Sequence, residues 1–61
     1  MREANAYIIR NGQKALVMEA VDKIEPEDDG LRLVNVFGHQ KFLHARIDAL
    51  FLVNHKVFLK E

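Results

Sequence analysis

Hydrophobic and polar residues alternate along most of this chain, in short runs rich in Val, Ile, Leu, Phe and Tyr. Pairs typical of tight turns, such as Asn11-Gly12 and Gly38-His39, separate the runs. A period of two is typical of β-strands, and Asn-Gly favours the positive backbone angles of hairpin turns. We predict strands over residues 3–10, 13–18, 31–37, 40–47, 50–53 and 56–60, with a turn at Asn54-His55. After a bend at Glu19-Ala20 the second of them continues as a short strand over 21–25.

Strands joined by such short loops predict an all-β fold. Five or six short antiparallel strands in a strongly bent sheet favour a small SH3- or Sm-like barrel, and residues 1–61 are expected to form a single domain. A helix over residues 14–24 is the alternative interpretation of that segment. It lacks a cap, and Val17, Val21 and Ile24 are β-branched, which favours a strand.

Apolar residues occur on both faces of several predicted strands. Leu31, Leu33, Asn35 and Phe37 share one face of their strand, and Arg32, Val34 and Val36 share the other. A domain of this size buries only about 60% of the surface of its unfolded chain, and a second copy could cover the apolar remainder. We therefore predict a homodimer. Its expected interface residues are Val34, Val36, Phe42 and Phe58. Long charged side chains could instead cover these positions.

Nine basic residues balance nine acidic ones, so no overall field attracts nucleic acid or an anionic membrane. Aromatic and basic residues nevertheless interleave in the second half of the chain. A surface for single-stranded nucleic acid or RNA is therefore the alternative function, and its candidate residues are Lys41, Phe42, Arg46 and Lys60. Zero net charge argues against strong binding of this kind.

The chemistry of the chain does not indicate an enzyme. It contains no serine, threonine or cysteine, so the usual nucleophiles are missing. His39 and His44 are five residues apart, which places them on opposite faces of a strand, and His55 lies in another turn. This spacing predicts no metal site. The longest apolar runs are too short to cross a bilayer, and without cysteine or an export signal we expect the cytoplasm.

Several short stretches occur in the same order as in a known family. They are Glu-Ala-Asn-Ala-Tyr at 3–7, Leu-Val-Met-Glu at 16–19, Asp-Gly-Leu-Arg-Leu at 29–33, Phe-Gly at 37–38, Gln-Lys-Phe at 40–42, Ala-Arg-Ile at 45–47 and His-Lys-Val at 55–57. With them the chain resembles, nearly end to end, the small CooT-type proteins, a nickel-binding family sometimes described as predicted RNA-binding.

The resemblance implies a homodimer of small β-barrels that handles nickel for the maturation of a client protein, carbon monoxide dehydrogenase. The key ligand of the family is a cysteine directly after the initiator methionine, and here that position is Arg2. Arginine stays protonated and cannot replace a soft thiolate. Met1, through its amine and backbone, and His55 remain as weak candidate ligands. We expect the fold to be shared and thiolate-dependent nickel binding to be lost or weakened.

Overall fold

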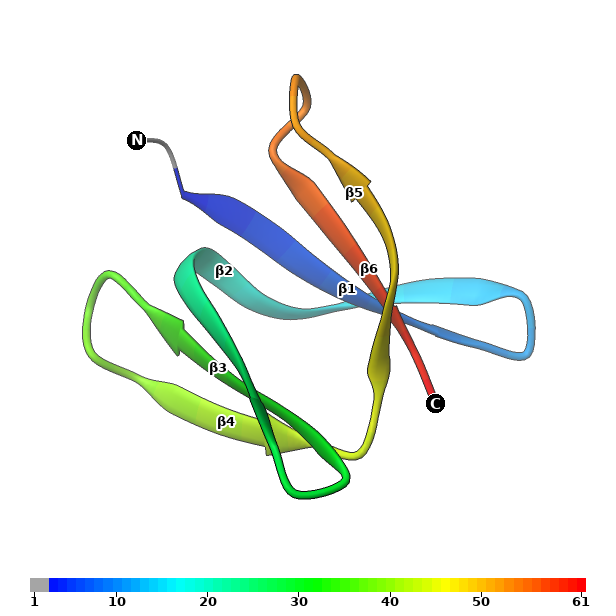
Figure 1. The fold of residues 1–61 in the computed structure, drawn as a ribbon. Helices are drawn as coiled ribbons and strands as arrows, with labels where there is room; N and C mark the ends of the chain where they lie inside the picture. Colours follow the sequence, from blue (N-terminus) through cyan, green and yellow to red (C-terminus); the bar gives the residue numbers. More distant parts are fainter. Residues whose placement is uncertain (1–2) are drawn as a thin grey trace.

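The computed structural model describes residues 3–61, which form six strands (Figure 1). Their bounds are β1 Ala4–Arg10, β2 Gln13–Glu27, β3 Gly30–Asn35, β4 Gln40–Leu43, β5 Arg46–Phe51 and β6 Lys56–Lys60. The predicted all-β class is confirmed, and the alternative helix over residues 14–24 is wrong. Within residues 3–61 no helix is long and apolar enough to cross a membrane.

The six strands form a single sheet in the order β4-β3-β2-β1-β6-β5. Neighbouring strands are antiparallel except β1 and β6, which run parallel, so the expectation of a wholly antiparallel sheet is wrong. The sheet is strongly twisted and bent (Figure 1). The described strands β4 and β5 lie at its two edges and do not pair with each other, so the sheet is not closed into the predicted barrel.

The long strand β2 joins the two halves of the sheet. Its first part pairs with β1 and its last part pairs with β3, so the strand predicted over 13–18 and its predicted continuation over 21–25 form one strand. The predicted bend is present inside the strand, where Ala20 has a φ of 56° and the register shifts on both sides. Pro26 does not end the strand, because it still lies opposite Leu31.

The core lies on one face of the bent sheet. Its buried members are Ala6, Ile8, Met18, Val21, Leu31, Leu33, Val57 and Leu59. In β3 the predicted alternation is confirmed, since Leu31, Leu33 and Asn35 are buried while Arg32 and Val34 are partly exposed. Four of the six strands contribute to this cluster, so its packing holds β1, β2, β3 and β6 together.

Two predicted strands end earlier than expected. The strand predicted over 31–37 stops at Asn35, because the Asn35 Oδ1 accepts hydrogen bonds from the N–H groups of Phe37 and His39 and organises a turn there. The strand predicted over 40–47 is interrupted at residues 44–45, and β5 then runs through Phe51. The predicted strand over 56–60 is confirmed as β6.

Candidate functional site

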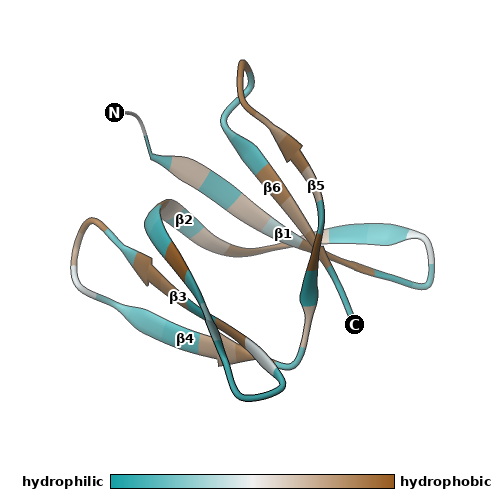
Figure 2. Ribbon diagram, viewed as in Figure 1, coloured by the Kyte–Doolittle hydropathy of each residue, from teal (hydrophilic) through white to brown (hydrophobic). Residues whose placement is uncertain are grey.

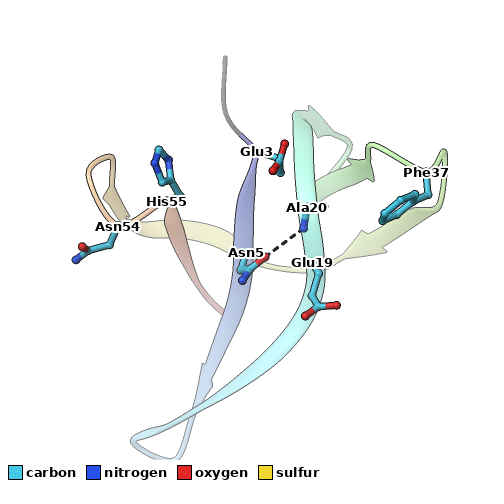
Figure 3. Close-up of a pocket in the computed structure, with 7 residues that line it drawn as sticks. All are labelled: Glu3, Asn5, Glu19, Ala20, Phe37, Asn54 and His55. Carbon is cyan, nitrogen blue, oxygen red and sulfur yellow. Dashed lines mark hydrogen bonds between the residues drawn. The ribbon is translucent and has the colours of Figure 1, made fainter.

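A cavity of about 410 Å³ lies at the N-terminal end of β1 (Figure 3). It is bounded by the bend in β2, the turn between β3 and β4, and the turn between β5 and β6. Its lining residues are Glu3, Asn5, Glu19, Ala20, Phe37, Asn54 and His55. Because it lies where three separate parts of the chain meet the start of β1, we treat it as the candidate site.

Asn5 fixes the backbone around this cavity. Its N–H donates a hydrogen bond to the carbonyl of His55 at 3.0 Å, and its side-chain oxygen accepts one from the N–H of Ala20 at 3.2 Å. Ala20 and His55 have φ values of 56° and 55°, in a region that costs energy for residues other than glycine. One residue of β1 thus supports two strained positions on either side of it, and strained backbone of this kind is often found at functional sites.

The ionisable side chains of the cavity do not converge. Figure 3 shows His55 and Glu19 on opposite sides of Asn5, directed away from each other. No group of three His, Cys, Asp or Glu side chains in residues 3–61 is placed to hold a metal ion, and the chain has no cysteine. The candidates Met1 and Arg2 lie outside the residues that the structure describes.

The three histidines lie in separate surroundings. The Nδ1 of His39 is 3.5 Å from the side-chain nitrogen of Asn35, in the turn after β3. The Nδ1 of His44 is 3.2 Å from a carboxylate oxygen of Asp29, and its ring meets that of Phe42 edge-on. Only His55 lines the candidate cavity. They cannot act together on one ion or substrate in this conformation.

The predicted interface residues differ in exposure. Val36 is 47% exposed in the turn after β3, and Val34 and Phe42 are partly buried. Phe58 lies outside the core cluster, as its neighbours Val57 and Leu59 suggested, but it is only 8% exposed. The rings of Tyr7 and Phe51 pack on it, and the Lys14 Nζ lies 4.6 Å from its ring centre. The chain itself therefore covers Phe58.

Most of the large exposed apolar side chains lie elsewhere, on β5 and the turn that follows it. Figure 2 colours the end of β5 and this turn as hydrophobic. Of the eight large hydrophobic residues that are exposed in the described part of the chain, five belong to residues 47–53. They are Ile47, Leu50, Phe51, Leu52 and Val53. The sequence predicts a strand of a closing hairpin over 50–53, whereas β5 ends at Phe51. The apolar run from Ala49 to Val53 could have indicated an exposed apolar surface.

The four residues of the nucleic-acid hypothesis do not form one surface. Lys41 lies opposite Leu33 and donates from its Nζ to the carbonyl of Val17 at 3.2 Å. The next residue, Phe42, points to the other face of β4. Arg46 and Lys60 lie opposite each other on β5 and β6, at the far edge of the sheet, where they line a shallow hollow together with the acidic Asp29 and Glu61. The structure thus places Arg46 beside Lys60, whereas Lys41 contacts β2 instead.

Comparison with known proteins gives consistent results. The model of the family described as "CO dehydrogenase accessory protein CooT" matches residues 1–60. The crystal structure of a CooT candidate from Carboxydothermus hydrogenoformans superposes with a TM-score of 0.90 at 41% sequence identity, over 95% of this chain and 94% of that one. No curated protein matches the chain. Both similarities extend over nearly the whole sequence.

Proposed function

This chain belongs to the CooT family of CO dehydrogenase accessory proteins, and we propose that it acts as a non-catalytic accessory protein in the maturation of a client CO dehydrogenase. The match of the family over residues 1–60 carries this proposal. It is supported by a similarity in fold that extends over 95% of the chain. The role is contact with the client enzyme, not chemistry.

The side chains available support an accessory role. The chain lacks the hydroxyl and thiol groups that serve most enzymes as nucleophiles. The single histidine–carboxylate pair in the described residues, His44 with Asp29, is more than 70% exposed on both sides. General acid–base catalysis needs such a pair beside a bound substrate. An exposed pair without an oxyanion site or nucleophile does not meet that requirement.

We further propose that the chain does not carry nickel as a tightly held ion. Nickel would be its cargo, and soft thiolate or imidazole ligands in a convergent set would be needed to hold it. Arg2 stands where the family has a cysteine, and residues 3–61 contain no convergent group of ligands. We expect the protein to work as a homodimer, with any nickel affinity limited to weak binding by separate histidines.

Maturation of the client tests the proposal directly. Purified nickel-free CO dehydrogenase is incubated with nickel, with and without this chain, and the rate at which activity appears is measured. We expect the chain to raise this rate and to bind the purified enzyme in calorimetry. A carrier protein of equal mass is the control. The proposal fails if the two purified proteins do not associate at about 50 μM and the rate of activation is unchanged.

A further inference from the structure

A second cavity, of about 420 Å³, lies between β2 and the turn that joins β3 to β4. This volume is within the range of pockets that hold small molecules. The cavity shares Glu19 and Phe37 with the candidate site and is otherwise formed by different residues. Its lining residues are Val17, Met18, Glu19, Asn35, Phe37, His39, Gln40 and Lys41. The chemistry of these side chains decides what the cavity can bind.

Lys41 gives this cavity a positive charge that is held in place. Its Nζ donates a hydrogen bond to the carbonyl of Val17 at 3.2 Å, which fixes the ammonium against β2. The ion pairs within residues 3–61 do not include Lys41, so its charge is not neutralised by a carboxylate of the described chain. An ammonium has three N–H donors, and the bond to Val17 uses one. Two donors therefore remain for an anion.

Asn35 and His39 add neutral hydrogen-bond donors to the lining. The Asn35 side chain is only 8% exposed, and its oxygen accepts hydrogen bonds from the N–H groups of Phe37 and His39 at 3.0 and 2.9 Å. The side-chain nitrogen of Asn35 can only donate, and it lies 3.5 Å from the Nδ1 of His39. Nδ1 is then the acceptor, so neutral His39 carries its proton on Nε2 and can donate it to a ligand.

The cavity also has an apolar part. Phe37 is 72% exposed, which is unusual for an aromatic side chain of this size, and its ring lines the cavity from the turn after β3. Met18, at 8% exposure, supplies apolar surface from β2 on the other side. An aromatic or apolar group that enters the cavity would cover the Phe37 ring and leave water.

The charges of the lining favour a ligand with a single negative charge. Among the described lining residues, Glu19 has the only carboxylate, and it offsets the charge of Lys41. A doubly charged group such as phosphate would be repelled by Glu19 twice as strongly as a carboxylate. Figure 3 shows Glu19 well apart from the Phe37 ring, so a singly charged ligand beside that ring can keep its distance from Glu19.

We propose that this cavity binds a free small-molecule carboxylate with an aromatic or apolar body. The carboxylate accepts hydrogen bonds from the Nζ of Lys41 and from the donors of Asn35 and His39, and the body packs on Phe37 and Met18. This site uses neither the ligands expected for nickel nor a contact with the client enzyme. The inference therefore stands or falls independently of the accessory role.

Three related probes test the proposal. Amide shifts of the full chain are followed by NMR during titration with benzoate, with benzamide, which lacks the charge, and with acetate, which lacks the ring. We expect benzoate to shift the amides of residues 17–19 and 35–41 with a dissociation constant of about 1 mM, as is usual for a ligand of so few atoms. Benzamide and acetate should bind about fivefold more weakly, because each lacks one of the two contacts.

Variants of the lining assign each contact. Lys41→Gln removes the cation and should bind benzoate no better than benzamide, whereas Lys41→Arg keeps the charge and should keep the preference for benzoate. Phe37→Ala should weaken the binding of benzoate and leave that of acetate unchanged. Lys23→Gln is the matched control, because Lys23 is exposed on β2 and does not line the cavity.

The proposal is overturned if benzoate at about 20 mM leaves the amides of residues 17–19 and 35–41 unshifted. Shifts that gather at the exposed apolar residues 50–53 instead, or equal binding of benzoate and benzamide by wild type, would also overturn it. Should Lys41→Gln fail to fold, the comparison of the three probes on wild type and on Lys41→Arg decides.

Discussion

The side-chain oxygen of Asn5 accepts a hydrogen bond from the backbone N–H of Ala20 at 3.2 Å, which ties β1 to the bend in β2. Asn5→Ala removes this acceptor and leaves the partly buried N–H of Ala20 without the hydrogen bond. We expect the free energy of unfolding to fall by about 1 kcal/mol, measured by urea denaturation. Asn54→Ala is the control, because Asn54 lines the same cavity but is exposed, and its effect should stay within about 0.5 kcal/mol. Equal losses in the two variants would contradict the assigned role.

The backbone conformation of Ala20 is one that glycine should adopt at lower cost than alanine. A φ of 56° is costly for alanine and easily adopted by glycine. Ala20→Gly should therefore raise the free energy of unfolding by about 0.5–1 kcal/mol. Ala15→Gly, in the same strand but with ordinary backbone angles, should instead lower it by about 0.5–1 kcal/mol. The opposite signs are the result to look for, and a loss of stability in both variants would show that Ala20 is not strained.

Local pattern was enough to predict the strand content of this fold and the place of the bend in β2. Alternation correctly assigned Leu31 and Leu33 to the core face, because burial on one side of a strand requires a period of two. The parallel pairing of β1 with β6 was not predictable in the same way. A strand's own pattern does not identify its partner, and residues 5–9 and 56–60 are separated by the rest of the sheet in sequence.

The candidate site was harder to predict than the fold. Phe58 was assigned to an interface because it opposes two core residues in its strand. Its cover comes from Tyr7 and Phe51 on neighbouring strands, contacts that depend on the unpredicted order of the sheet. The role of Asn5 was also missed. A short polar residue in a strand gives no local signal that it will reach a backbone N–H fifteen residues away.

The ion pair between Arg10 and Glu61 should be visible in the titration of the Glu61 carboxyl. Its hydrogen bond, 2.9 Å long, and the charge of Arg10 lower the pKa of the Glu61 side chain. Arg10→Gln should therefore raise that pKa toward the ordinary value of glutamate, as followed by NMR titration of the Glu61 carboxyl. Lys56→Gln, at the other end of β6, is the control and should leave the pKa of Glu61 unchanged.

The direction of the pKa shift also fixes the direction of the effect on stability. A carboxyl whose pKa is lower in the folded state stabilises that state above its unfolded pKa, and the contribution disappears as the pH falls through the folded pKa. The pair is exposed, so the effect should be small and should weaken with salt. An effect of Arg10→Gln on stability that is larger at low pH than at pH 7 would contradict this assignment.

Arg2 makes the last prediction, which concerns nickel. The resemblance to the CooT-type proteins implies a cysteine ligand at this position, yet the chain carries an always-protonated guanidinium there. Wild type should bind nickel no more tightly than the micromolar range, without absorption from thiolate-to-metal charge transfer. Arg2→Cys should gain that absorption and lose it on acidification, because a thiolate ligand must be deprotonated. Arg2→Ser is the matched control, since it removes the positive charge without adding a thiolate, and it should bind nickel as wild type does.

Tight binding by wild type would show that the cysteine is not needed. A folded Arg2→Cys variant that ignores nickel would mean that a thiolate at residue 2 is not sufficient on this scaffold.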